Sequence, residues 1–271
     1  MLIPPHKSPW LEKWFHHYIR RYLQRSFHCI HGIGMPPLPE GDGRTPLIVC
    51  LNHSSWWDVL LGFYAGREWL PWESYGVMDA LQLKRYRLFT RLGMIGVDRT
   101  RLSGAKEFVD FTERLLRGQH RALWVTPQGE MVSNQRRPIR FQPGLGLLAE
   151  RLGDFYITTI VLHYAFWNER LPEAFISFSP LTHIQTTGND FHRKTFLASQ
   201  ERAMEAQLDA LLHLVERRDS RAFQPLLRGK SGISPTYDAF RALTARLRGE
   251  PFTVEHGDQS TPRWRDRPHN H

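Results

Sequence analysis

The stretch Leu47-Ile-Val-Cys-Leu-Asn-His-Ser-Ser-Trp-Trp-Asp58 decides the fold of this chain. Its first five residues form a continuous aliphatic run, which is typical of a strand that is buried on both faces. A polar turn follows directly, and the apolar segment from Val59 to Ala65 predicts a helix that Ser54 or Ser55 could cap. A strand that passes through a tight polar turn into a helix is typical of α/β proteins, and such turns are a common place for chemistry.

His53 and Asp58 lie five residues apart in this turn. On a straight helix their side chains would point about 140° apart, so they can meet only if His53 is on the loop and Asp58 is in the first helical turn. A carboxylate that reaches back to the imidazole fixes the tautomer of the ring and raises its basicity, which is the condition for a general base near neutral pH. The alternative is a histidine beside an unrelated helix-cap aspartate.

Two later segments have the same form, an apolar run that ends in polar residues. Gly93-Met-Ile-Gly-Val-Asp-Arg99 ends in an arginine, whose forked guanidinium can hold a phosphate or another oxyanion. The run from Ala122 to Val125 ends in Thr126-Pro127-Gln128-Gly129, where the glycine lets the backbone approach a ligand closely. The alternatives are a solvated surface arginine and an ordinary turn containing proline and glycine.

The rest of the chain completes an α/β domain. Further strands are predicted over 157–162 and 175–178, and further helices over 103–117, 191–217 and 237–248. Glycine and proline predict a loop over 32–46, and the polar residues 255–271 are predicted to be disordered. We therefore expect a single α/β domain with a mixed, largely parallel sheet flanked by helices, preceded by an N-terminal amphipathic helix.

An amphipathic helix is predicted from Trp10 to Phe27, where pairs of apolar residues alternate with pairs of polar ones. This spacing places an aromatic stripe on one face and a basic stripe on the other. Rings at headgroup depth and cations against anionic lipid are what a helix in a membrane interface requires. The residues expected to face the membrane are Trp10, Trp14, Phe15, Tyr18 and Tyr22. The alternative is that the helix packs its aromatic stripe against the domain.

Composition limits the partners of the chain. It has 36 Lys and Arg against 27 Asp and Glu, a formal net charge of +9 at pH 7, so an anionic partner is favoured. Nucleic acid is not expected, because the predicted helix separates aromatic residues from cations and no nucleic-acid-binding motif is recognised. The two cysteines exclude a disulfide scaffold and a four-cysteine zinc site. No apolar run approaches the roughly 20 residues of a membrane span, and no signal peptide is recognised, so we expect a peripheral protein on the cytoplasmic side of the cell membrane.

Four motifs, taken in order, resemble the glycerolipid acyltransferases of the lysophosphatidate acyltransferase type. Asn52-His53-x-Ser55-x-x-Asp58 is similar to the first motif of that family, and Gly93 to Arg99 to the second. Leu123-Trp-Val-Thr126-Pro127-Gln128-Gly129-Glu130 is similar to the third, and Ile157 to Leu162 to the fourth. The resemblance covers roughly residues 45–165 and implies the fold of glycerol-3-phosphate acyltransferases.

The resemblance also implies a reaction. His53 would take the proton of an acceptor hydroxyl, Asp58 would orient His53, and the acceptor oxygen would attack the thioester of acyl-CoA or acyl carrier protein. No metal or cofactor is implied beyond this acyl donor. The residues that the resemblance assigns to substrate binding are Asn52, Ser55, Arg99, Thr126, Pro127, Gln128, Gly129 and Glu130. The expected organisation is a membrane-association helix over 1–31, an acyltransferase domain over 32–254 and a tail over 255–271.

Three positions depart from the family pattern. Gln128 replaces the glutamate of the third motif, Met131 replaces its arginine, and Thr159 replaces the usual proline of the fourth. If the missing arginine grips the phosphate of the acceptor, then Arg136, Arg137 or Arg140 would have to supply that grip. The acceptor could therefore be a lysophospholipid, a glycolipid or another membrane alcohol. The departures also leave open a second function, that of a lipid-binding protein that has the same fold but does not catalyse the reaction.

Overall fold

The strand Leu47–Leu51 (β2) lies in the interior of a mixed sheet in the computed structural model, which describes residues 2–38, 43–98, 102–186, 191–230 and 244. Among the described residues the sheet has nine strands in the order β4-β3-β5-β2-β6-β7-β1-β9, with β8 paired to β6. The strands are β1 (Cys29–Ile33), β2, β3 (Glu73–Asp79), β4 (Met94–Val97), β5 (Arg121–Val125), β6 (Asp154–Ala165), β7 (Glu173–Phe178), β8 (Thr182–Gln185) and β9 (Gln224–Arg228).

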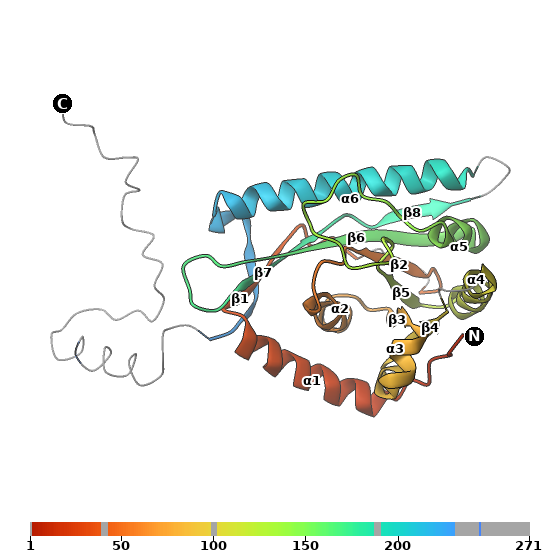
Figure 1. Ribbon diagram of the computed structural model, residues 1–271, viewed down its shortest axis with the longest axis horizontal. Helices are drawn as coiled ribbons and strands as arrows, with labels where there is room; N and C mark the ends of the chain where they lie inside the picture. Colours follow the sequence, from red (N-terminus) through yellow and green to blue (C-terminus); the bar gives the residue numbers. More distant parts are fainter. Residues whose placement is uncertain (1, 39–42, 99–101, 187–190, 231–243, 245–271) are drawn as a thin grey trace.

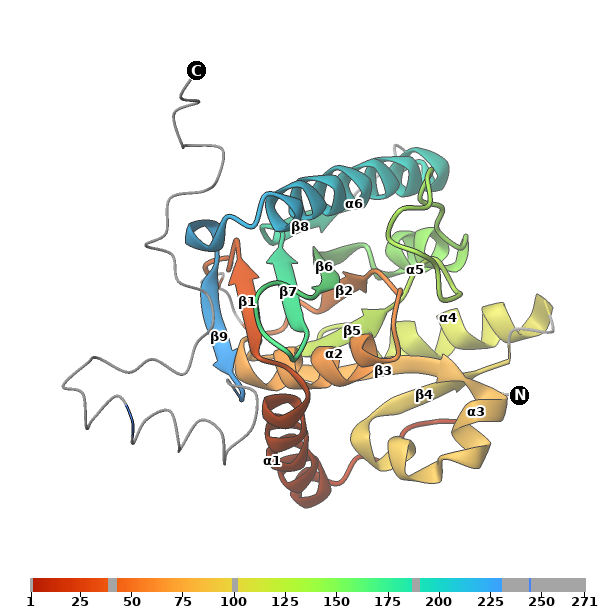
Figure 2. The ribbon, with the colours of Figure 1, turned by 60° about the vertical axis from the view of Figure 1, so that its left-hand side comes forward.

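Most neighbouring strands run parallel. The block β4-β3-β5-β2-β6 is parallel throughout, and β1 is parallel to β7. Strand β6 is antiparallel to β7 and β8, and β9 is antiparallel to β1. Figure 2 shows β9 and β1 at one end of the sheet and β4 toward the other. The predicted α/β class with a mixed, largely parallel sheet is therefore confirmed.

Helices cover both faces of the sheet (Figure 1). They are α1 (Pro9–Ser26), α2 (Trp57–Glu68), α3 (Ala80–Arg85), the 3₁₀ helix η1 (Arg87–Leu92), α4 (Leu102–Leu116), α5 (Gly144–Leu152), α6 (Arg193–Glu216) and the 3₁₀ helix η2 (Ser220–Ala222). Helices α4, α5 and α6 lie on one face, and α1, α2 and α3 lie on the other. No helix in the described ranges is both long and apolar enough to cross a bilayer.

Strand β2 shows why the aliphatic run was needed. Ile48 and Cys50 belong to the core cluster formed with α4, α5 and α6, whereas Leu47, Val49 and Leu51 belong to the cluster formed with α1 and α2. Successive side chains of a strand point to opposite faces. A strand covered by helices on both faces must therefore be apolar at every position.

Several predicted elements match the structure within a few residues. Helix α1 corresponds to the predicted amphipathic helix, α2 to the helix after the polar turn, α4 to 103–117 and α6 to 191–217. The predicted strands over 122–125, 157–162 and 175–178 fall inside β5, β6 and β7. Trp56, rather than Ser54 or Ser55, is the N-cap residue of α2. The predicted helix over 237–248 and the tail over 255–271 fall outside the described residues, apart from residue 244 in the helix.

The predicted loop over 32–46 is wrong at its start, because Gly32 and Ile33 belong to β1. The predicted boundary after residue 31 consequently falls inside this strand. A Cβ atom on Gly32 would lie 2.5 Å from Leu226 Cδ1. The glycine therefore serves the close packing of β9 on β1 and does not mark a turn.

Helix α1 corrects one of the residues expected to face a membrane. Phe15 is buried, with its ring against Phe63 (centroid distance 5.6 Å) and Phe89 (6.2 Å). It belongs with Ile19 and Leu23 to a stripe that packs on the domain. The expected aromatic face is thus divided, because the apolar pairs cover an arc wide enough for two surfaces. One part packs inward, and the other, Trp10, Trp14 and Tyr18, is exposed.

Candidate active site

The first and third motifs meet at one edge of the sheet. Strands β2 and β5 are parallel neighbours, so the turns that follow Leu51 and Val125 leave the same edge. A backbone hydrogen bond joins the two segments, in which Val132 N donates to His53 O (2.7 Å). The Gln128 side-chain oxygen also accepts a hydrogen bond from the backbone N–H of His53 (3.3 Å). Segments that are some 75 residues apart in the chain are thereby held together.

His53 and Asp58 form the hydrogen bond that the sequence predicted. His53 Nδ1 lies 3.0 Å from Asp58 Oδ2, with His53 on the loop and Asp58 in the first turn of α2. The Asp58 side chain is fully buried, whereas 20% of the His53 side chain remains exposed. Because a carboxylate only accepts, Nδ1 carries the proton in a neutral ring and Nε2 carries the lone pair. This tautomer presents Nε2 as a proton acceptor.

The carboxylate of Asp58 is held at both oxygens. Oδ2 also accepts hydrogen bonds from the backbone N–H groups of Ser54 (2.6 Å) and Ser55 (2.7 Å). Oδ1 accepts one from the Tyr164 hydroxyl (2.5 Å). A buried carboxylate needs such partners, because an unpaired charge is costly to bury. The orientation of Asp58, and through it that of His53, is fixed by the fold.

Burial moves the pKa values of two consecutive residues of β6, Tyr164 and His163. The pKa of Tyr164 is raised well above its ordinary value, first by burial and then by the negative charge of Asp58. Tyr164 therefore stays protonated and remains a hydrogen-bond donor. The pKa of His163 on the same strand is lowered by burial.

Asn52 is placed differently from its expected role in substrate binding. It is buried, and its amide donates to Leu162 O (3.0 Å) and Asn134 Oδ1 (2.8 Å) while accepting from Leu162 N (2.7 Å). These bonds tie the end of β2 to β6. The structure thus gives Asn52 a positioning role for the turn, since its polar atoms are already used within the protein.

The turn after β5 has the conformation that its sequence requires. Gly129 has φ of 79°, in the left-handed region that glycine tolerates. The Gly129 N–H donates to Thr126 O (2.9 Å), and Pro127 O accepts from Gln142 N (2.7 Å). Pro127 is buried, whereas Glu130 is exposed. Ser55 accepts a hydrogen bond from Trp57 N at its hydroxyl (3.3 Å).

The three arginines considered as phosphate ligands differ in their surroundings. Arg137 pairs with Asp209, and Arg140 pairs with Glu201 (3.1 Å), so both attach this segment to α6. Arg136 lies 3.6 Å from Glu130, and both of these side chains are mostly exposed. Exposed pairs of this kind are weak. Arg140 is exposed as well, but it is Arg136 that lies against Glu130 at the end of the turn. Arg99 lies outside the described residues.

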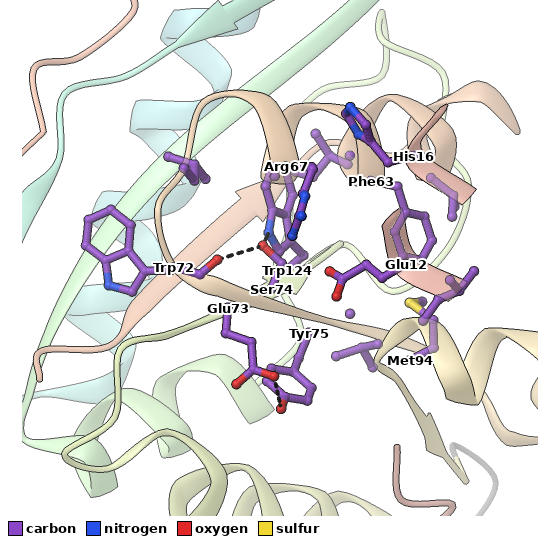
Figure 3. A pocket seen from close by; sticks show the side chains of 18 of the residues that line it. Glu12, His16, Phe63, Arg67, Trp72, Glu73, Ser74, Tyr75, Met94 and Trp124 are labelled. Carbon is purple, nitrogen blue, oxygen red and sulfur yellow. Dashed lines mark hydrogen bonds between the residues drawn. The ribbon is translucent and has the colours of Figure 1, made fainter. Parts of the chain in front are cut away.

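A cavity of about 450 Å³ extends from Asp58, at the start of α2. Asp58, Val59 and Thr126 line it at the carboxyl edge of the sheet, and Trp72 and Ser74 line it at the amino edge. Figure 3 shows Phe63, Met94 and Trp124 around this space, which lies between α1, α2 and the strands. Asp58 and Arg67, which both line it, are separated by about 14 Å along α2 at the usual helical rise. The cavity is therefore elongated.

The amino end of the cavity is polar. Lys7 Nζ lies 3.3 Å from Glu12 and 3.6 Å from Glu73, and it donates to Ser74 O (2.9 Å). Glu73 in turn accepts from the Tyr75 hydroxyl (2.8 Å), as Figure 3 shows. The end of the cavity opposite Asp58 is therefore lined by charged groups. Within the described ranges no group of three or more His, Cys, Asp or Glu residues is arranged to hold a metal ion.

Comparison with models of known protein families identifies the family of the chain. The family model named Acyltransferase matches residues 27–163, just over half of the 271 residues. The chain belongs to the Acyltransferase family. The kinship expected from the four motifs is confirmed, and the matched region contains His53, Asp58 and the turn after β5.

Other comparisons add little to this acyltransferase assignment. The crystal structure of the 1-acyl-sn-glycerophosphate acyltransferase PlsC from Thermotoga maritima is similar at a TM-score of 0.46 and 13% identity, covering 72% of this chain and 79% of that one. No curated protein matches the chain.

Two positioning residues of this acyltransferase were missed by sequence reasoning. Tyr164 lies 106 residues from its partner Asp58, and Asn134 lies 82 residues from Asn52. No local pattern marks either of them, because a strand tyrosine and a loop asparagine are common. The available signal for Tyr164 was its position two residues after the segment that resembles the fourth motif.

Proposed function

We propose that this acyltransferase moves a fatty acyl group from acyl-CoA or acyl carrier protein to a hydroxyl of a lysophospholipid or a related lipid alcohol. The observation that carries the proposal is that Asp58, the hydrogen-bond partner of His53, lines one end of an elongated, largely apolar cavity. Such a cavity suits an acyl chain. A fatty acyl chain lying in it would bring its thioester close to the turn from Asn52 to Asp58, which is the catalytic turn in this proposal.

In the proposed reaction His53 is the general base. Nε2 takes the proton of the acceptor hydroxyl as the oxygen attacks the thioester carbonyl. The carbon–sulfur bond then breaks, and the proton held by His53 passes to the leaving sulfur. Asp58 keeps the ring in the required tautomer and favours the imidazolium that forms. The turn from Thr126 to Glu130 and, as its cation, Arg136 are proposed to hold the acceptor; Arg99 is proposed for the same role from the family pattern.

We further propose that α1 attaches the enzyme to the cytoplasmic side of the cell membrane. Trp10, Trp14 and Tyr18 are exposed at 74%, 52% and 49% on one helix, and large exposed aromatic residues in one stripe favour a lipid interface. A chain of ring contacts connects this stripe to the start of α2. The ring of Trp14 lies 5.7 Å from that of Tyr18, Tyr18 lies 5.9 Å from Tyr22, and Tyr22 lies 5.5 Å from Trp57. Tyr22 is half-buried and belongs to this connection.

The test is thiol release from palmitoyl-CoA and palmitoyl-acyl carrier protein with a panel of lysolipid and glycolipid acceptors. We expect one acceptor to stimulate release and His53→Ala to abolish it. His183→Ala is the matched control, because His183 also bonds an aspartate (Asp154, 2.6 Å) but lies on β8, away from the catalytic turn. Lipid binding without release by any acceptor would favour the alternative of a lipid-binding protein, which the changes at Gln128 and Met131 motivate.

A further inference from the structure

The segment from α3 to η1 exposes apolar side chains that nothing in the proposed reaction uses. Leu81, Tyr86 and Leu88 are exposed at 68%, 45% and 47%. The same segment is anchored by Leu83 and Leu92, which are buried. A firmly held segment that keeps large apolar groups in water is a candidate contact surface.

The cations of this segment stand between the apolar groups. Lys84, Arg85 and Arg87 are exposed, and no acidic residue occurs in the sequence from Ala80 to Val97. In the part of the chain that the structure describes, none of the three cations has an ion pair. We refer to Leu81, Lys84, Arg85, Tyr86, Arg87 and Leu88 together as the α3–η1 patch.

The patch continues the surface of α1. The chain before α1 is bonded to η1, since His6 N donates to Thr90 O (2.9 Å) and Ser8 N donates to Arg91 O (2.9 Å). Phe89 of η1 also packs edge-on against Phe15 of α1. Figure 1 shows α1 and α3 on the same side of the sheet, opposite α6. Backbone hydrogen bonds and ring packing thus join the segment that carries the patch to the helix that carries the exposed aromatic stripe.

We propose that the α3–η1 patch is a second contact with an anionic lipid bilayer, beside α1. This inference rests on the proposed attachment of α1 to a membrane. Leucine and tyrosine side chains would enter the headgroup region while the three cations meet lipid phosphates. The mixture of apolar and basic groups favours lipid over an acidic protein such as acyl carrier protein, for which cations alone would suffice. Two contacts on separate elements would also fix the tilt of the enzyme on the membrane.

The experiment is flotation of the full chain with vesicles of phosphatidylcholine alone and of phosphatidylcholine mixed with phosphatidylglycerol. One variant, Leu81→Ser/Leu88→Ser, removes apolar groups, and another, Lys84→Gln/Arg85→Gln/Arg87→Gln, removes charges. We expect the charge variant to lose about tenfold or more in partition onto anionic vesicles, and the apolar variant to lose partition onto both kinds. Thermal unfolding of each variant shows whether it is folded.

Matched controls separate the patch from net charge and from α1. Lys194→Gln/Arg202→Gln/Arg217→Gln removes three exposed cations on and just after α6, and we expect it to bind anionic vesicles like wild type. If folded patch variants bind like wild type while Trp10→Ser/Trp14→Ser does not, the patch is no lipid contact and the attachment through α1 stands. If wild type does not float at all, both ideas fail, while thiol release still tests the reaction itself.

One further outcome would overturn the proposal in favour of a protein partner. The charge variant could bind vesicles normally and yet lose thiol release from palmitoyl-acyl carrier protein, but not from palmitoyl-CoA. That result would assign the patch to the acidic carrier protein. The lipid contact would be supported if the charge variant lost vesicle binding but still released thiol from both donors when the acceptor was dispersed in detergent.

Discussion

The Tyr164 hydroxyl donates a hydrogen bond to Asp58 Oδ1 at 2.5 Å, across 106 residues of sequence. Asp58 Oδ2 faces His53, so the two oxygens of one carboxylate connect the end of β6 to the turn after β2. Burial and the charge of Asp58 hold the pKa of Tyr164 well above its ordinary value. Its proton is therefore retained at every pH at which the enzyme would work. Tyr164 is thus placed to orient His53 through Asp58.

We predict that Tyr164→Phe lowers kcat with little change in KM. A hydrogen bond to a charged group contributes about 1.5–3 kcal/mol, so a loss of roughly tenfold or more is expected as Asp58 loses its fixed orientation. The measurement is thiol release at saturating acceptor. Tyr156→Phe, at the other end of β6, is the control and should retain activity. An unchanged kcat in a folded Tyr164→Phe protein would show that the backbone bonds of Asp58 suffice.

The parts of the fold that were predictable are those with a clear hydrophobic period. Strand β2 is apolar at every residue and α1 has pairs of apolar residues at helical spacing, so tertiary packing reinforces the local pattern. Strand β3, Glu-Ser-Tyr-Gly-Val-Met-Asp, carries polar residues and a glycine because it borders the cavity. Because these residues line a cavity, β3 lacks the regular apolar pattern of a buried strand, and it was not predicted from the sequence.

The candidate site was predictable only where its partners are close in sequence. The bond between His53 and Asp58 follows from a spacing of five residues and a strand-to-helix turn. By contrast, the burial of Asn52 depends on Leu162 in a distant strand. Phe15 shows the same limit, since the period of α1 marks its apolar arc but not which part of that arc meets the domain.

We predict that Met131→Arg shifts acceptor preference toward lysophosphatidate. Met131 is 56% exposed beside the catalytic turn, where an arginine could add a charge-assisted hydrogen bond to a phosphate. Such a bond is expected to raise kcat/KM for lysophosphatidate by about tenfold relative to an uncharged glycolipid acceptor. Met131→Gln, of similar length without the charge, should leave the ratio unchanged. Equal ratios for the arginine and glutamine variants would place the acceptor headgroup elsewhere.

We predict that filling the cavity from α2 shortens the acyl chain that the enzyme prefers. A Cβ atom at position 62 would lie 3.6 Å from Leu51 Cδ2 and from Trp124 Cε3, an ordinary contact. Gly62→Ala should therefore fold, with a gain of up to about 1 kcal/mol from helix propensity, and keep most activity. Gly62→Leu extends into the cavity and should lower kcat/KM for palmitoyl-CoA more than for shorter donors. A donor profile that is unchanged in Gly62→Leu would mean that the acyl chain lies outside this cavity.

We predict that the free energy of unfolding falls with acidification in part because of His163. Burial lowers the pKa of His163 in the folded protein, and its Nδ1 lies 3.3 Å from Asn134 Nδ2, which suits a neutral ring. Below about pH 6.5 a histidine of the unfolded chain takes up a proton, whereas folded His163 does so only at lower pH. Between these two pH values the unfolded state binds more protons than the folded state. The contribution of neutral His163 to stability is therefore complete above about pH 6.5 and declines as the pH falls toward the lowered pKa. His163→Asn keeps an oxygen as acceptor for Asn134 and cannot titrate, so urea unfolding between about pH 5 and 8 should depend less steeply on pH in the variant. The same slope in both proteins would mean that His163 does not contribute to the acid sensitivity of the fold.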